Sequence, residues 1–245
     1  MALIEKLRNI ADAIRGETGK TDALTLDQMA TEIAGISAGV LHPLIDRSIT
    51  TAPDMEGIYT IGARAFARCG NMIATKFPST VRKIDDYAFE SCGKIAFTEL
   101  NDNVEYIGAY AFANCRELML TKLPQNLGIK GDFISTYSFQ NCSKMPLTSL
   151  PSYTRGISNA AFEGCTMLAI THIPEKVQTV GNYAFNGCKG LTEITFEGTA
   201  SSIAGSAFRD CTNLLTINVP WAEGAVGNAP WGATNATINY NYTEG

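Results

Sequence analysis

The stretch IGAYAFANCREL, residues 107–118, is one of seven copies of a motif that recurs along this chain of 245 residues. Each copy has a phenylalanine, preceded by alanine or once by serine, and a cysteine three positions later. Successive copies are 23 residues apart, except for one spacing of 27 between Cys115 and Cys142. The repeated pairs are Phe66 and Cys69, Phe89 and Cys92, Phe112 and Cys115, Phe139 and Cys142, Phe162 and Cys165, Phe185 and Cys188, and Phe208 and Cys211.

Aliphatic residues frame each copy of the motif. One stands five positions before each phenylalanine, and another three positions after each cysteine. A unit of this length cannot bury its own apolar face, so successive copies must stack on one another. We therefore predict a solenoid of seven coils over residues 61–219, each about 23 residues long, with phenylalanine and cysteine in continuous internal columns.

Two kinds of local structure are expected within each coil. The segment from alanine to cysteine predicts a tight helical turn, in which the small alanine permits close approach and phenylalanine fills the core. Residues 118–124 suit a short strand that ends at Pro124, since proline cannot donate to a continuing ladder. The longer spacing predicts a loop at residues 128–132. Together these elements indicate an α+β repeat fold.

The repeat resembles the BspA-like subclass of leucine-rich repeats, and the resemblance covers about residues 44–220. Seven aligned copies make this a specific match. The resemblance implies an adhesive or partner-binding surface, and it implies no catalytic role for any repeat position.

Residues 1–37 follow a different pattern, which predicts a small helical hairpin. Apolar residues recur at helical spacing on both sides of a polar turn, and residues 25–28 form a capping box for the second helix. The apolar seam consists of Leu3, Leu7, Ile10 and Ile14 on the first helix and Leu26, Met29, Ile33 and Ile36 on the second. A hairpin this small must dock its seam against another surface to be stable.

Two interpretations of the hairpin remain. It either caps the first coil or attaches the chain to other proteins, and the same seam is compatible with a homo-oligomer. Residues 38–60 are expected to be a linker and N-terminal capping strand, with a flexible joint at residues 37–39 and a strand at residues 44–49 that is able to cap the solenoid. The sequence therefore favours attachment as the role of the hairpin.

Both ends of the chain also resemble phage proteins. Residues 10–29 resemble an N-terminal segment of tail and other virion-associated proteins of phages that infect Gram-positive bacteria. Residues 219–238 resemble the terminus of phage leucine-rich-repeat proteins. These resemblances imply a virion protein of the tail tip or baseplate that contacts other virion proteins. Residues 220–245 are expected to form a C-terminal cap, in which Ala236, Ile238 and Tyr240 alternate with polar residues as in a covering strand.

Several other kinds of function lack a signal in the sequence. The 19 basic and 24 acidic residues are scattered, so no nucleic-acid partner is expected. We expect no membrane insertion and no secretory signal, and hence synthesis in the host cytoplasm. The cysteines lack paired C-x-x-C spacing and are expected to be buried, reduced thiols and not zinc ligands or disulfides. With only His42 and His172 available, we expect no enzyme, no metal and no cofactor.

Two outward stripes are candidates for ligand binding. Strand alternation predicts that positions six and eight after each cysteine point inward and position seven outward. Position seven holds Lys76, Glu99, Lys122, Ser149, His172, Thr195 and Asn218. A second stripe, two residues before each phenylalanine, holds Arg64, Tyr87, Tyr110, Tyr137, Ala160, Tyr183 and Ser206. The stripes are either solvated surface or, since tyrosine suits interfaces, contacts for a cell-wall glycan or surface protein.

Three functions fit these observations. The first is a phage virion component that displays the solenoid for host-cell recognition or adhesion. The second is a purely structural decoration or assembly protein of the particle. The third is a cellular BspA-like surface adhesin, which the expected lack of a signal peptide and anchor disfavours.

Overall fold

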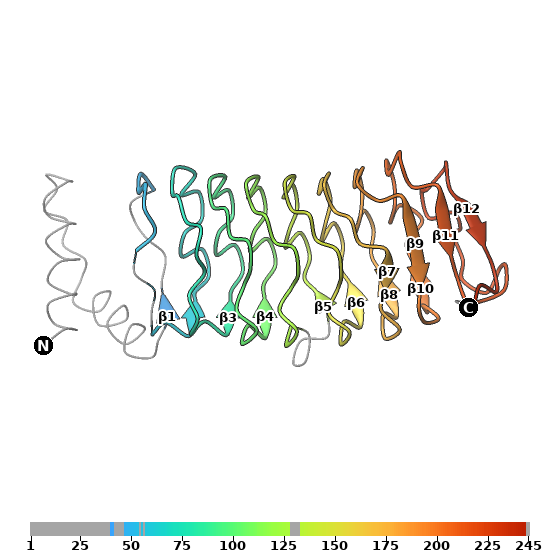
Figure 1. The fold of residues 1–245 in the computed structure, drawn as a ribbon, viewed down its shortest axis with the longest axis horizontal. Coiled ribbons are helices and arrows are strands. Elements are labelled where there is room, and N and C mark those ends of the chain that lie inside the picture. Colours follow the sequence, from blue (N-terminus) through green and yellow to red (C-terminus); the bar gives the residue numbers. More distant parts are fainter. Residues whose placement is uncertain (1–39, 42–46, 54, 56, 128–132, 244–245) are drawn as a thin grey trace, which may run out of the picture.

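In the computed structural model, short coils stack along one axis into an elongated solenoid (Figure 1). The structure describes residues 40–41, 47–53, 55, 57–127 and 133–243. Its strands are β1 (Val40–Leu41), β2 (Thr60–Ile61), β3 (Lys83–Ile84), β4 (Tyr106–Ile107), β5 (Phe133–Ile134), β6 (Gly156–Ile157), β7 (His172–Ile173), β8 (Thr179–Val180), β9 (Glu193–Phe196), β10 (Ser202–Ile203), β11 (Thr216–Asn218) and β12 (Thr237–Asn239). The predicted hairpin of residues 1–37, its seam, and the predicted loop at residues 128–132 lie outside the described residues.

The strands form three parallel sheets. One has the order β1-β2-β3-β4, the second β10-β8-β6-β5, and the third β12-β11-β9-β7. Within the first two sheets, the aliphatic residue that opens each repeat lies in register with its equivalent, as in the pairing of Ile61 with Ile84. Between β4 and β5, where the 27-residue spacing falls, the Ser135 hydroxyl donates to the Ile107 carbonyl at 2.6 Å.

The segment from alanine to cysteine is a chain of turns, so the predicted helical turn is wrong. Left-handed residues interrupt any helix, such as Tyr110 with φ 57° directly before the segment and Asn114 with φ 62° within it. Amide groups then bond alternately within the turn and to the next coil. The Ala113 amide donates to Tyr110 O at 3.1 Å, whereas the Phe112 amide donates to Ser138 O at 2.8 Å. No helix occurs among the described residues, so the α+β class is not supported there.

The solenoid extends one coil beyond the seven that carry the phenylalanine and cysteine motif. Trp231 stands 23 residues after Phe208, is fully buried, and accepts the Phe208 amide at its carbonyl at 2.9 Å. Strand β12, predicted to cover this end, pairs in parallel with β11. The predicted C-terminal cap therefore includes an eighth coil, in which the Trp231 ring packs against Phe196 and Trp221.

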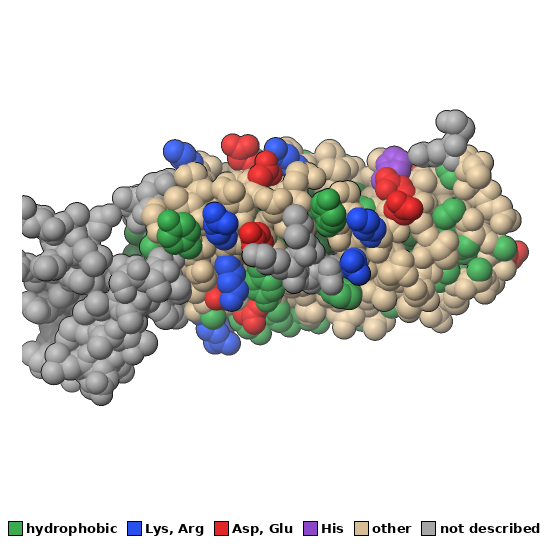
Figure 2. Space-filling model, turned by 90° about the horizontal axis from the view of Figure 1, so that it is seen from below, with side chains coloured by type: hydrophobic (Ala, Val, Ile, Leu, Met, Phe, Trp, Pro, Cys, Tyr) green, Lys and Arg blue, Asp and Glu red, His purple; other side chains and the backbone are tan. Residues whose placement is uncertain are grey.

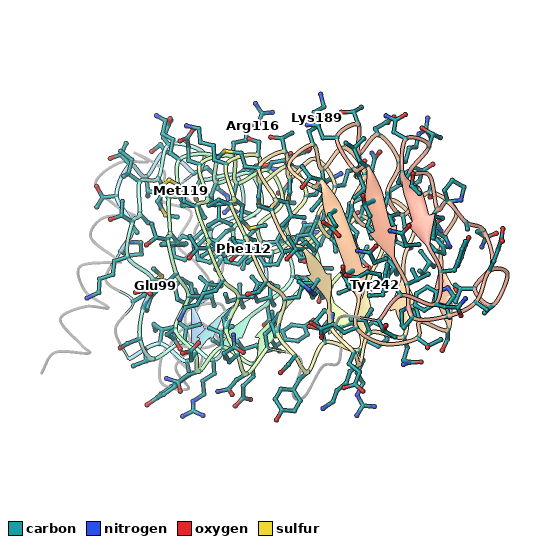
Figure 3. The ribbon with its side chains drawn as sticks, turned by 45° about the vertical axis from the view of Figure 1, so that its right-hand side comes forward. Glu99, Phe112, Arg116, Met119, Lys189 and Tyr242 are labelled. Atoms are coloured by element: carbon teal, nitrogen blue, oxygen red, sulfur yellow. The ribbon has the colours of Figure 1, made fainter. Side chains whose placement is uncertain are left out.

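The predicted internal columns are confirmed. Neighbouring rings of the phenylalanine column stack face to face with centroids 5.1–5.6 Å apart and planes within 9° of parallel. All seven rings are inaccessible to solvent. Figure 3 shows Phe112 inside the rod, whereas Arg116 and Lys189 project from its edge.

The cysteines form a second column and carry hydrogen bonds that the sequence did not indicate. All seven are free and buried, as predicted. From Cys92 onward, each thiol donates to the phenylalanine carbonyl of the preceding coil at 2.9–3.1 Å, as Cys92 does to Phe66 O. The thiol is thus both a small apolar group and a link between coils.

Burial strongly disfavours the thiolate form in this column. It raises the pKa of Cys92 and Cys211 to about 12. It also raises the pKa of Cys115, Cys142, Cys165 and Cys188. A group whose pKa is higher when folded stabilises the fold below its unfolded pKa, and this contribution is lost as the pH rises.

We predict that Phe112→Ala lowers the free energy of unfolding by about 3–5 kcal/mol, because it leaves a cavity between two stacked rings. Urea denaturation followed by circular dichroism measures this change. The exposed Lys122→Ala serves as a control and should stay within about 0.5 kcal/mol of the wild type. A loss for Phe112→Ala no larger than that of the control would contradict the continuous column.

We also predict that stability falls steeply from about pH 9 to pH 11, because the thiols ionise in the unfolded chain but not in the folded one. Each thiol lowers the free energy of unfolding by up to about 1.4 kcal/mol per pH unit in this range. Urea midpoints at pH 7, 9 and 10.5 test this, and Cys188→Ala should show a shallower loss than the wild type. Equal slopes for the two proteins would refute the assigned role of the thiols.

Candidate functional site

Three of the predicted tyrosines form a continuous aromatic stack. The rings of Tyr87 and Tyr110 lie 4.7 Å apart with planes 5° from parallel, and those of Tyr110 and Tyr137 lie 4.5 Å apart at 14°. The Arg64 guanidinium carbon lies 4.7 Å from the Tyr87 ring centroid. We call Arg64, Tyr87, Tyr110 and Tyr137 the tyrosine stack.

The backbone holds these side chains in place. All four residues of the tyrosine stack are left-handed, with φ between 56° and 61°. This conformation costs a non-glycine residue roughly 1–2 kcal/mol. Hydrogen bonds to the next coil offset the cost, such as that from the Tyr87 amide to Ala109 O at 2.8 Å and that from Tyr137 to Asn159 O at 3.0 Å. The stack is therefore ordered before any ligand arrives.

The aromatic stripe does not run the full length of the solenoid. Ala160 takes the next position after Tyr137 and is buried, and Tyr183 follows as a single ring that is 38% exposed. The predicted stripe thus divides into the tyrosine stack and an isolated Tyr183.

Face-to-face stacking limits what the tyrosine stack offers a ligand. Inner ring faces cover one another, so a sugar is unable to lie on them as the sequence suggested. The edges and hydroxyl groups remain. Partial burial, with smaller effects of Tyr137 and Tyr87, raises the pKa of Tyr110, which keeps its phenol protonated as a hydrogen-bond donor.

The predicted polar stripe at position seven is only partly correct. Lys76, Glu99, Lys122 and Ser149 are exposed, but His172 is half-buried, and Thr195 and Asn218 are buried. Position six, predicted to point inward, is exposed in the first five coils, where it holds Thr75, Thr98, Thr121, Thr148 and Thr171. In the last two motif-bearing coils, position six is buried as predicted, at Ile194 and Ile217, but position seven is buried as well.

The local sequence explains this difference. In the early coils, two polar residues separate the buried positions, as in Leu120-Thr121-Lys122-Leu123, so the chain is unable to alternate and the predicted strand at residues 118–124 does not form. In β9, the apolar Ile194 and Phe196 flank Thr195, and this alternation of residue types suits a strand, although all three residues are buried. The third sheet accordingly forms only toward the C-terminus.

Hydrogen bonds within the protein occupy the C-terminal part of this stripe. The Asn218 amide donates to Glu193 at 2.6 Å and to Thr195 at 3.0 Å, and its oxygen accepts from Asn239 at 2.8 Å. His172 Nδ1 lies 2.8 Å from the Thr171 hydroxyl. This part is a satisfied polar network, so the exposed half of the stripe is the part that is able to meet a ligand.

Two exposed aromatic residues on the first two sheets were not predicted from the sequence as candidate ligand contacts. Tyr106 in β4 is 36% exposed and Phe133 in β5 is 47% exposed. Both immediately precede the buried isoleucine of their coil, so the alignment of the repeats could have indicated that they point outward. Lys83 Nζ lies 5.5 Å from the Tyr106 ring. Figure 2 shows acidic and basic side chains intermixed on the face seen from below.

Neither a metal cluster nor a membrane span is found where the structure describes the chain. No group of three His, Cys, Asp or Glu side chains is placed there to hold a metal ion. None of the elements described is a helix with the length and apolarity needed to span a bilayer. The expected absence of enzyme activity, metal and cofactor stays a prediction.

Comparison with known families identifies the repeat. The model of the BspA type leucine-rich repeat region matches residues 47–133 and 132–228, which together cover well over half of the chain. The protein therefore belongs to the BspA-type leucine-rich repeat family. A comparison with curated proteins gives no match.

Solved leucine-rich repeat structures resemble the chain only distantly. A leucine-rich repeat protein of T. pallidum is 24% identical, with a TM-score of 0.47, over 60% of this chain and 69% of the other. A leucine-rich cell surface protein of Faecalibacterium prausnitzii is 22% identical, with a TM-score of 0.41, over 71% and 60%. A leucine-rich repeat protein of Bacteroides ovatus is 18% identical, with a TM-score of 0.38, over 82% and 71%.

We predict that a cysteine introduced at Thr121 or Lys122 reacts rapidly with a fluorescent maleimide, whereas one at Thr195 or Asn218 reacts at least tenfold more slowly. The native thiols are buried and supply a low background. Labelling at pH 7, followed by mass spectrometry, measures the rates. Fast labelling at Asn218 would contradict the buried polar network.

Proposed function

We propose that this protein is a non-enzymatic recognition protein of a phage particle, which displays its solenoid to the host-cell surface from the tail tip or baseplate. The observation that supports a binding role most directly is the tyrosine stack. Four large side chains are held in fixed positions on a rigid rod, so a partner would contact them with little loss of side-chain entropy. Tyrosine and arginine are also the residues that contribute most often to interface hot spots.

The virion location is proposed from the two ends of the chain. Residues 10–29 and 219–238 carry the phage resemblances, and residues 1–37 offer an apolar seam for attachment to other virion proteins. In this proposal the protein is made in the host cytoplasm and is incorporated into the particle. The attached end then leaves the solenoid free to meet a glycan or protein on the host cell.

Two alternatives make different experimental forecasts. A purely structural decoration protein would be found on particles but would not bind host cells. A cellular adhesin would bind a surface but would be absent from particles. Immunogold labelling of purified particles, combined with cell binding by the purified protein, separates these possibilities.

We predict that Tyr87→Ala, Tyr110→Ala and Tyr137→Ala together lower the affinity for host cells at least tenfold, because they remove the stack and its hydroxyl groups. Flow cytometry with fluorescently labelled protein measures the binding. The triple tyrosine-to-phenylalanine variant keeps the rings and tests the hydroxyl groups separately.

The control for this experiment is Tyr59→Ala, which removes a 51% exposed aromatic ring outside the tyrosine stack. It should bind as the wild type does. Unchanged host binding by the triple alanine variant, with its urea midpoint preserved, would rule out the tyrosine stack as the contact surface.

A further inference from the structure

A shallow groove of about 390 Å³ crosses the face of the sheet β10-β8-β6-β5. Its lining includes Phe133 at one end, the hydroxyl-bearing Thr179 and Ser202, and the amides of Asn159 and Asn182. Asn159 and Asn182 immediately precede Ala160 and Tyr183 of the aromatic stripe. The groove therefore adjoins the place where the tyrosine stack ends.

The repeat alignment explains why the surface is hollow here. The first residue of each short strand on this side of the solenoid points outward. Its side chain is large in three successive coils, which have Lys83, Tyr106 and Phe133. It then becomes small, with Gly156, Thr179 and Ser202. The drop in side-chain size begins at β6, so Phe133 stands at the edge of a depression.

Phe133 is positioned by the absence of a side chain at Gly156. A Cβ atom on Gly156 would collide with Cδ1 and Cε1 of the Phe133 ring. The ring thus leans over the neighbouring coil, and 47% of the residue remains accessible. An exposed ring fixed against a sheet is able to pack against the C–H groups of a ligand.

The groove wall provides a hydrogen-bond donor with a defined direction. Asn159 Oδ1 accepts the Asn182 amide at 2.9 Å, which identifies the other atom of the carboxamide as its NH₂ group. Asn159 is exposed, and its Nδ2 atom has no hydrogen-bond partner among the described residues. One amide donor is therefore free to bond with a ligand.

The lining is neutral as well as polar. None of the described residues that line the groove is charged. An anionic ligand or nucleic acid would require basic groups. A peptide that adds a strand would require an open edge, but β6 is paired on one side with β5 and on the other with β8.

We infer that this groove binds a neutral hexose-containing glycan. The ring of Phe133 packs against the apolar face of a sugar, while Asn159 and the groove hydroxyls bond to its hydroxyl groups. This inference rests on the proposed role in host recognition, and it names the class of ligand recognised. It also places the sugar beside the tyrosine stack, whose inner ring faces are covered.

Saturation-transfer NMR and calorimetry with neutral tetrasaccharides of glucose, galactose or N-acetylglucosamine test the inference. At least one should bind the full chain, and Phe133→Ala should weaken it at least tenfold, whereas Phe133→Trp retains binding. Asn159→Asp keeps the acceptor for the Asn182 amide, as Asp86 does for Ala109 at 2.8 Å, but lacks the donor. It should therefore fold normally and lose affinity, while Tyr59→Ala binds as the wild type does.

Parallel host-cell binding distinguishes this inference from the proposed function. Cell binding without affinity for any neutral tetrasaccharide, or with Phe133→Ala and Asn159→Asp equal to the wild type, would overturn the groove inference and leave the recognition role intact. Glycan binding that depends on Phe133 and Asn159 without cell binding would support the groove and overturn the recognition role.

Discussion

The structure depends on the stacking of one phenylalanine ring per coil on the ring of the next coil. At 5.1–5.6 Å between centroids, each inner ring is covered on both faces by its equivalents, so no coil completes its core alone. The thiols donate hydrogen bonds to the preceding coil and the turn amides donate to the next coil, so both sets hold the same register. In the coil after Phe208, the fully buried Trp231 packs against Trp221 and Phe196.

This register also determines the surface. Since equivalent positions lie over one another, every outward position becomes a row, and the residues in that row decide its shape. Large flat side chains produce the tyrosine stack, and the change to Ala160 ends it. On the neighbouring sheet, the change from Phe133 to Gly156 opens the groove. A solenoid of nearly identical coils thus acquires distinct sites through substitutions at single row positions.

The sequence predicted the buried positions that recur in every coil correctly. It failed at positions where the backbone is not regular helix or strand. The buried thiols and the phenylalanine column followed directly from spacing. The helical turn was wrong because left-handed residues such as Tyr110 turn alternate amides toward the next coil. The inward position six was wrong because the adjacent polar pair Thr121-Lys122 prevents strand alternation, although the pair is visible in the sequence.

The sequence by itself determined the repeat, its family, the residues of the core and the order of side chains in each outer row. Only the tertiary structure decided which row positions touch. Tyrosines that are 23 or 27 residues apart either stack closely or splay apart, and the left-handed backbone brings their ring centroids to 4.5–4.7 Å. The groove, likewise, exists because Phe133 leans across Gly156 of the next coil, a contact between residues 23 positions apart that depends on how the coils pack.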